Sequence, residues 1–450
     1  MLFGRDAEQR YNRKSFLRMK VLRSGWLRWL VIVLALLLFA FLLFLVWAHR
    51  PPIAEITPPP RTAFAAAEIR RGENLARIGN CVSCHQSAHG RPFAGGYGVQ
   101  SPFGTIYGTN ITPDAQTGIG RWSLEAFTRS MREGVSRDGR HLYPAFPYTH
   151  YTLVSDADLR ALYAYFMTRD PVRAEAPVNE LPLPLKFRPF IAGWKLLFFE
   201  PDRFRRDPDQ SAEWNRGAYL GEGLAHCSAC HSPRNWLGAE QRSEAYNGGW
   251  SAGWYAPPLN ETSPAVRAWT ARRLQSYLRT GLSVHHAAAA GPMGPVTHNL
   301  ARADEADVRA LSSYYAWWMR DAPASNREPP LADRSETARR AHPAGAALFA
   351  GACATCHEPG ATMMALGGRP ALPLGSPLHE RHPHDTIQII LNGLQPPVDE
   401  AGPFMPAYRD ILTDRQVAQL VAYLRTRYGS GPEWPDLVEE VTEARENSAP

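Results

Sequence analysis

All six cysteines of the chain belong to three copies of one short pattern, Cys-x-x-Cys-His. Each copy joins two thiols, which can form thioether bonds, to an imidazole, which can bind iron. This pattern is the attachment site of c-type haem: the two sulfurs hold the porphyrin edge and the histidine reaches the iron from one face. The predicted haem-binding residues are Cys81, Cys84 and His85, then Cys227, Cys230 and His231, and then Cys353, Cys356 and His357.

Other uses of paired cysteines explain the pattern less well. A thioredoxin-like pair does not need a histidine after it three times over, and a zinc site needs a fourth ligand. A disulfide across two intervening residues is strained and leaves the histidine without a role. The sequence therefore predicts three covalently bound haem c groups.

An electron-transfer haem iron also needs a ligand on its second face, and a methionine thioether is the usual one because it raises the potential. Met293, in GPMGPV, lies 62 residues after His231, and Met405, in GPFMPAY, lies 48 residues after His357. Neighbouring prolines would hold both loops stiffly. These two methionines are the predicted second ligands of the second and third irons.

The first copy of the motif departs from this arrangement. At the matching distance, 61 residues after His85, the chain has Phe146, which cannot bind iron. His150, four residues further on, is the leading substitute and would give a bis-histidine haem of lower potential. His141 is the next candidate, followed by Met131 or Met167. An iron with an open face is the remaining alternative, and it would permit a multi-haem peroxidase.

A helix is predicted after each copy of the motif, over 155–167, 304–319 and 413–428, because apolar residues recur along one face. Each begins at an N-cap residue, namely Ser155, Asp304 or Thr413, and Thr413 forms a capping box with Gln416. A shorter glycine-containing segment precedes each motif. This repeat resembles small single-haem cytochrome c domains.

The expected fold is therefore mainly α, with three tandem cytochrome c-like domains preceded by one N-terminal transmembrane helix. The predicted parts are a cytoplasmic basic segment (1–28), the transmembrane helix (29–48), a linker (49–66), domain 1 (67–173), a linker (174–210), domain 2 (211–320), a linker (321–342), domain 3 (343–430) and an acidic tail (431–450). We expect the tail to be solvated, with docking to a basic partner as the alternative. We expect the apolar stretch 187–199 to pack between haem domains, with a partner or membrane-surface contact as the alternative.

The net charge of +6 does not indicate nucleic-acid binding, because the first 28 residues hold eight basic and two acidic side chains and account for all of it. Those charges precede Trp29–Ala48, twenty uncharged residues whose helix would span about 30 Å of hydrocarbon. The basic end should stay in the cytoplasm. We expect a single-pass anchor in the bacterial inner membrane with the haem domains in the periplasm; a cleaved signal peptide is the rival interpretation.

Several long motifs resemble one family, the three-haem cytochrome c subunits of bacterial membrane-bound dehydrogenases. They are FGTIYGTNITPDAQTGIGRW, LYPAFPY, FRPFIAGWKLLFF, WNRGAYLGEGLAHCSACHSPRN, GPMGPV and FMPAYRD, and the resemblance extends over about residues 67–429. In this family, Met293 and Met405 stand where methionine ligands are expected. The alcohol and sugar-acid branches carry methionine at the position of Phe146.

The resemblance implies an electron relay rather than substrate chemistry. A partner dehydrogenase would oxidise the substrate, and this subunit would pass the electrons to ubiquinone or a terminal oxidase. Phe146 followed by His150 is similar to the branch that accompanies molybdenum hydroxylase-type aldehyde dehydrogenases, with a molybdopterin catalytic subunit and an iron–sulfur small subunit. The alternatives are a partner of quinoprotein alcohol or flavin sugar-acid dehydrogenase type, a free-standing electron carrier, and the peroxidase.

Overall fold

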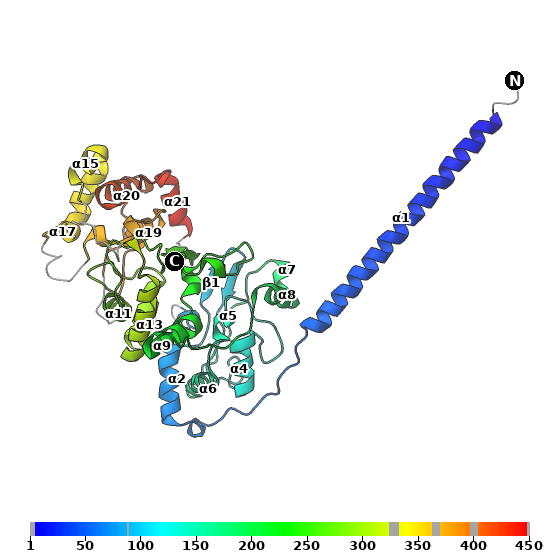
Figure 1. Cartoon of the computed structure of the whole chain (residues 1–450), viewed down its shortest axis with the longest axis horizontal. Coiled ribbons are helices and arrows are strands. Elements are labelled where there is room, and N and C mark those ends of the chain that lie inside the picture. Colours follow the sequence, from blue (N-terminus) through cyan, green and yellow to red (C-terminus); the bar gives the residue numbers. More distant parts are fainter. Residues whose placement is uncertain (1–4, 88–89, 324–332, 362–369, 397–403, 448–450) are drawn as a thin grey trace.

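The computed structural model describes residues 5–87, 90–323, 333–361, 370–396 and 404–447. Over these ranges the chain is mainly helical, with two short antiparallel hairpins. We call α2–α6 the first unit, α9–α13 the second unit and α15–α21 the third unit; each contains one Cys-x-x-Cys-His motif. Figure 1 shows these units side by side and the long helix α1 (Arg5–Ala48) projecting away from them.

The first and second units repeat the same order of elements. The first contains α2 (Ala66–Ile78), α3 (Cys81–Cys84), β1 (Gly98–Ser101), β2 (Gly104–Tyr107), α4 (Leu124–Glu133), α5 (Tyr148–Tyr151) and α6 (Asp156–Met167), preceded by η1 (Arg61–Ala63). The second contains α9 (Ala212–Ala218), η2 (Tyr219–Leu224), α10 (Ser228–His231), η3 (Arg242–Glu244), β3 (Gly249–Ser251), β4 (Trp254–Ala256), α11 (Ala271–Thr280), α12 (Met293–Ala301) and α13 (Glu305–Trp318).

The third unit has no strand in its described part. It contains α15 (Ser335–Ala341), α16 (Pro343–Leu348), η4 (Phe349–Cys353), α17 (Ala354–His357), η5 (Leu372–Leu374), η6 (Ser376–Leu378), α19 (His384–Asn392), α20 (Asp414–Tyr428) and α21 (Leu437–Asn447). Between the first and second units lie α7 (Leu183–Lys186) and α8 (Pro189–Phe198).

The helix before the motif crosses the last helix at a glycine in every unit. A Cβ atom at these glycines would lie 1.9, 2.0 and 2.1 Å from a backbone carbonyl oxygen of the last helix, so only glycine permits the crossing. A tyrosine of the last helix also lies against each glycine. The three sets are Gly72 with Ala161 and Tyr165, Gly217 with Ala310 and Tyr314, and Gly345 with Gln419 and Tyr423.

The predicted starts of the last helices are confirmed. Ser155 is the N-cap of α6 and its side chain accepts a hydrogen bond from the N–H of Asp158. Thr413 caps α20 and forms the expected capping box with Gln416. Asp304 is the N-cap residue of α13, although its side chain makes no capping hydrogen bond there.

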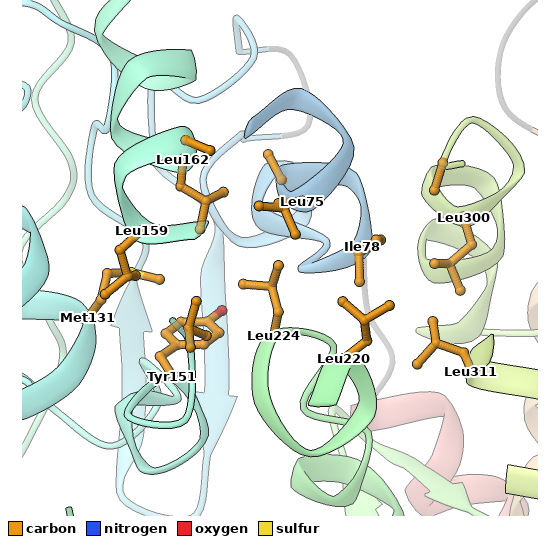
Figure 2. Packing of buried hydrophobic residues seen from close by; sticks show 14 of the residues in the cluster. Leu75, Ile78, Met131, Tyr151, Leu159, Leu162, Leu220, Leu224, Leu300 and Leu311 are labelled. Carbon is orange, nitrogen blue, oxygen red and sulfur yellow. The ribbon is translucent and has the colours of Figure 1, made fainter. Parts of the chain in front are cut away.

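One apolar core is continuous through the first and second units. Figure 2 shows Leu75 and Ile78 of α2 facing Leu220 and Leu224 of η2, while Leu311 of α13 lies at the far side. The third unit has a separate core, built on α19, α20 and α21. The first two units are therefore one hydrophobic body and the third is another.

Polar contacts join the first two units in a repeated manner, and one half of this junction centres on Asp158. The buried carboxylate of Asp158 accepts hydrogen bonds from Arg71 Nε of its own unit at 2.5 Å and from Tyr219 Oη of the second unit at 2.7 Å. The Tyr219 hydroxyl in turn accepts from the N–H of Ser155. Tyr219, at the start of η2, therefore forms hydrogen bonds with the first residues of α6 across the junction.

The other half of the junction centres on Asp307 and has the same form. Its carboxylate accepts from Arg216 Nε at 2.7 Å and from Asn74 Nδ2 of the first unit at 2.8 Å. The Asn74 side-chain oxygen accepts from the N–H of Asp304 at 2.7 Å. Since Asn74 and Tyr219 each lie two residues after the crossing glycine, the junction has approximate two-fold symmetry.

The third unit meets the second through the start of α19. Asp385 accepts a hydrogen bond from the N–H of Tyr255 in β4 at 2.9 Å. The rings of His382 and His384 lie 5.6 and 5.1 Å from the ring of Trp250, centroid to centroid. This junction is aromatic and polar, with no continuation of either apolar core among the described residues.

The expectation about the tail is wrong, and the one about the stretch 187–199 is confirmed in part. The tail is not fully solvated, because α21 buries Val441 and Ala444 against the third unit and Arg445 pairs with Asp414 at 2.6 Å. The stretch 187–199 packs between the first two units in part: α8 buries Ile191 against the first unit and Trp194 Nε1 donates to the Leu237 carbonyl oxygen of the second at 3.0 Å, but one face of α8 is exposed.

Candidate functional site

The three motifs lie in short helical turns, α3, α10 and α17, and all six cysteines are free thiols. Burial raises the pKa of Cys81 and Cys227 to about 12 and that of Cys353 to about 11. A thiol in apolar surroundings is a poor redox nucleophile, so the sites do not have the character of a thioredoxin-like pair. Unpaired thiols on a helical turn fit the attachment of a porphyrin edge.

The first two motif histidines are held in a defined orientation. His85 Nδ1 donates to the carbonyl oxygen of Thr109 at 2.6 Å, and His231 Nδ1 donates to that of Pro257 at 2.7 Å. Burial lowers the pKa of both imidazoles, which favours the neutral form that binds a metal. With Nδ1 in a hydrogen bond, Nε2 is the nitrogen available to iron.

Glycines bring the carbonyl-bearing segments close to the first two motifs. A Cβ at Gly108, next to Thr109, would lie 1.8 Å from the carbonyl oxygen of Cys84. A Cβ at Gly249 would lie 2.7 Å from that of Cys230. The residues present therefore fit a bound haem c at both motifs. His357 is half-buried at the end of α17, and residues 362–369 that follow lie outside the described ranges.

Phe146 and Met293 occupy the same place in their units, as the sequence count predicts. The N–H groups of Phe146 and Met293 donate to the carbonyl oxygens of Tyr143 and Ala290, three residues before each. The preceding helices α4 and α11 both end at a glycine with positive φ, Gly134 and Gly281. The N–H groups of Leu142 and Ala289, four residues before Phe146 and Met293, donate to these glycines' carbonyl oxygens. The phenylalanine thus stands where the second unit offers a thioether.

Met405 is placed differently from Met293. Its backbone pairs directly with Leu394, the residue after the glycine that ends α19, with both N–H···O distances at 2.9 Å. Its side chain is half-buried against the apolar core of the third unit. Residues 397–403, within the same loop, are outside the described ranges.

His150 does not lie free toward the first motif. Its Nδ1 donates to the Glu222 carbonyl oxygen at 2.9 Å and its Nε2 faces Glu240 Oε1 at 2.9 Å, both in the second unit. Burial opposes a charge on His150, but Glu240 outweighs this and raises its pKa. Burial would raise the pKa of Glu240, yet the imidazolium lowers it to about 2. His150 is an interface residue here, and iron ligation would require at least one of these bonds to break.

The other predicted candidates for the first iron are also engaged elsewhere. His141 Nε2 donates to the carbonyl oxygen of Ala48, the last residue of α1, at 2.8 Å, and its Nδ1 accepts from Lys195 Nζ at 3.2 Å. Met131 and Met167 are buried in the shared apolar core. The sequence carried no signal for the role of His141, which is to hold the end of α1.

The first two motifs lie near each other. Burial and the neighbouring thiol of Cys230 raise the pKa of Cys84 to about 11. Tyr151, whose ring lies 5.3 Å from that of Phe146, also lies 5.8 Å from the ring of His226, just before the second motif. The arrangement places two attachment sites across a single junction, which suits electron transfer at short range.

Two family models match parts of the chain. The model described as "Cytochrome c" matches residues 69–170, and the one described as "Cytochrome C oxidase, cbb3-type, subunit III" matches residues 340–424. The matched segments are the first and third units with their motifs.

Curated relatives cover most of the chain. One subunit of the nicotinate dehydrogenase of Pseudomonas putida is 44% identical over 402 residues, which is 88% of this chain but only 33% of that protein, so the chain spans about one third of its length. "Gluconate 2-dehydrogenase cytochrome c subunit" of Pantoea cypripedii is 35% identical over 404 residues, 85% of this chain and 90% of the relative. "Fructose dehydrogenase cytochrome subunit" of Gluconobacter japonicus is 34% identical over 406 residues, 84% of this chain and 82% of the relative.

Proposed function

The chain belongs to the family of cytochrome c subunits of membrane-bound dehydrogenases, and from this we propose that it is a membrane-anchored, three-haem electron relay. It would take electrons from the catalytic subunit of a periplasmic dehydrogenase and deliver them to ubiquinone or a terminal oxidase. Covalently bound haem c supplies one-electron chemistry at its iron. The observation that carries the proposal is the glycine crossing repeated beside three Cys-x-x-Cys-His motifs.

The number of haems is supported by the repeat of local geometry. Each unit presents the two free thiols of its motif after a helix that crosses the unit's last helix at a glycine. We propose that Cys81 and Cys84, Cys227 and Cys230, and Cys353 and Cys356 each hold one haem, with the proposed domain boundaries at 67–173, 211–320 and 343–430. His85, His231 and His357 would bind the three irons.

Met293 and Met405 are the proposed second ligands of the second and third irons. The first iron differs because Phe146 stands in place of the methionine. Because both nitrogens of His150 are bonded to the second unit, the first iron would have an open or exchangeable second face. Such an iron would favour the alternative function, a multi-haem peroxidase.

Anchoring is supported by α1, whose apolar segment Trp26–Ala48 is 23 residues long and leaves most of its large side chains exposed. At about 1.5 Å per residue this segment is long enough to cross a bilayer. The basic residues before it favour a cytoplasmic N-terminus, so that the three units would lie in the periplasm.

The partner is proposed to be of the molybdenum type, with a molybdopterin catalytic subunit and an iron–sulfur small subunit. The support is the match to a protein of nicotinate dehydrogenase, because nicotinate is an N-heterocycle and the corresponding branch serves molybdenum-dependent aldehyde or N-heterocycle dehydrogenases. Phe146, which stands in place of a methionine, also favours a partner of the molybdenum type. A quinoprotein alcohol or flavin sugar-acid dehydrogenase is the alternative partner, consistent with the gluconate and fructose dehydrogenase relatives.

One preparation tests the proposal. The full chain, extracted from membranes in mild detergent with its neighbouring gene products, should show the mass of three covalent haems and should carry a molybdopterin subunit. Bare thiols would overturn the haem assignment, and a cytochrome recovered alone at full abundance would overturn the complex. A wholly low-spin spectrum excludes the peroxidase, whereas a high-spin signal with peroxide turnover would replace the relay.

Ligation by Met293 is tested by the Met293→Ala variant, with Met319→Leu, at a buried core methionine at the end of α13, as the control. Loss of the thioether should lower the potential of one haem and create a high-spin signal, because methionine stabilises reduced iron. The control should leave both unchanged. An unchanged spectrum in Met293→Ala would exclude Met293 as the ligand.

A further inference from the structure

The segment α7–α8, between the first and second units, has two contrasting faces. Ile191, Ala192 and Lys195 recur on one side of α8 and are buried against the first unit. On the opposite side Leu196 and Leu197 are 70% and 68% exposed. A helix that leaves large aliphatic side chains in contact with water on one face has an unfilled apolar surface.

The apolar surface continues beyond α8. It includes Phe187 and also Leu183 of α7, which is 82% exposed, and Phe190 in the first turn of α8 is exposed on the same surface. Two of the three cations in 181–199, Arg188 and Lys195, bond back to His141, which leaves Lys186 as the exposed cation beside this face, and Glu180 and Glu200 stand at the two ends of the stretch. A broad apolar face with a cation at its edge is suited to the interface between hydrocarbon and lipid headgroups.

This surface lies directly against the membrane-spanning helix. The ring of Phe187 is 6.4 Å from that of Phe41, centroid to centroid, and Gly193 lies against the ring of Phe44. Figure 1 shows α7 and α8 at the end of α1 that meets the folded units. Phe41 is seven residues before Ala48, which places it about 10 Å along the helix axis from the end of the apolar segment.

Three contacts fix the orientation of α8 relative to the end of α1. His141 Nε2 donates to the Ala48 carbonyl oxygen, Arg188 Nη1 donates to the His141 carbonyl oxygen at 2.8 Å, and Lys195 Nζ donates to His141 Nδ1. Lys195 also donates to the carbonyl oxygen of Gly134 at 2.7 Å, at the end of α4. The anchor, α8 and the first unit are therefore joined as one body around His141.

We propose that α7 and α8 lie in the periplasmic surface of the lipid bilayer, with Leu183, Phe190 and the Leu196–Leu197 pair among the acyl chains. This inference rests on the proposed anchoring by α1. If α1 spans the membrane up to Ala48, the side chains that contact Phe41 and Phe44 are at the depth of the outer acyl chains. The first unit is then held at the membrane surface through α7 and α8.

The proposal is tested with full-length holoprotein in nanodiscs of phosphatidylethanolamine and phosphatidylglycerol. A photoreactive diazirine amino acid is placed at Leu197 or, as a control of equal exposure, at Ile411 of the third unit, which is 67% exposed. After illumination, mass spectrometry measures lipid adducts. We expect at least tenfold more phospholipid adduct at position 197 than at position 411.

The possible outcomes distinguish a failure of the proposed lipid contact from a failure of the proposed anchoring by α1. If the chain resists alkaline washing of native membranes but the probe at 197 gives water or protein adducts alone, the surface is not a lipid contact and the anchoring stands. If the chain is released by the wash, the anchoring fails and the inference fails with it. A Leu196→Glu/Leu197→Glu variant should reduce lipid adducts from a probe at Phe190 several-fold; unchanged adducts would also overturn the proposal.

Discussion

The junction between the first and second units differs in kind from the junction between the second and third. The first junction has a continuous apolar core and two buried carboxylates, Asp158 and Asp307, each bonded to both units. The second junction rests on the Asp385–Tyr255 hydrogen bond and ring contacts to Trp250. The comparison teaches that a chain of similar small units can contain one fused pair and one separately stabilised unit.

The largest expected effect comes from removing a pair of attachment cysteines. In Cys227→Ser/Cys230→Ser the second unit loses its haem and much of its core, and since that core is shared, the first unit should unfold as well. In Cys353→Ser/Cys356→Ser the first two units should remain folded with both haems. Haem content by mass and limited proteolysis measure the difference. Equal damage from both variants would show that all three units fold together.

The second prediction concerns Glu380, which is buried in the third unit. Burial, with Asp385 nearby, raises the pKa of Glu380 from 4.5 to about 8, against the attraction of Arg381 and Arg425. Between these values the unfolded chain has released its proton while the folded chain keeps it, so the free energy of unfolding falls as the pH rises. The third unit should therefore be less stable at pH 8 than at pH 5.

The Glu380→Gln variant should lack most of this dependence, because its side chain is neutral throughout. From about 1.4 kcal/mol for each unit of pKa shift, the difference between wild type and variant should be roughly 3 kcal/mol between pH 5 and pH 8. Urea unfolding of the third unit at both values measures it. The same pH slope in Glu380→Gln would assign the dependence to other groups.

The helix starts could be predicted from the sequence because their signals are local, and the Cys-x-x-Cys-His motifs that we propose as haem sites are equally local. An N-cap, a capping box and Cys-x-x-Cys-His each lie within five residues, so no distant contact is needed to interpret them. The burial of α21 also had a local signal, since Leu437, Val441 and Ala444 follow a helical spacing that the high acidic content of the tail obscured.

The partners of His150 and His141 could not be predicted in the same way. Each histidine is bonded to a segment far along the chain: His150 to Glu240, and His141 to Ala48. A histidine near the expected ligand position satisfies the sequence pattern equally well as a ligand or as an interface residue. The pairing of Asn74 with Asp307 is likewise set by how two units meet, which no single segment encodes.

The third prediction concerns the junction between the first and second units, which we call the fused junction, and removes its two buried carboxylates. Asp307→Ala removes the partner of Arg216 and Asn74, and Asp158→Ala removes that of Arg71 and Tyr219. Each should destabilise the first two units by about 2–3 kcal/mol, as expected for losing hydrogen bonds to a buried charge.

The matched control for this junction is Glu213→Ala, which removes an exposed ion pair with Arg309 and a hydrogen bond from Ser313 and should change stability by less than about 1 kcal/mol. Denaturant unfolding followed by circular dichroism measures all three variants. A strong effect of one carboxylate and none of the other would contradict the two-fold character of the junction.

The smallest expected effect is that of His150→Gln, and it bears on the first iron. The imidazole bridges Glu222 and Glu240 across the fused junction, so its replacement should cost about 1–2 kcal/mol, while the spin state of the first haem should not change. Because the pKa of His150 is raised in the folded chain, its contribution is present at low pH and is lost as the pH rises through that folded-state value. The variant should therefore differ most from wild type at pH 5 to 6. Electron paramagnetic resonance of the oxidised protein provides the decisive measurement: a new high-spin signal in His150→Gln would show that His150 leaves Glu240 to bind the first iron, and the fused junction would then include a ligand exchange.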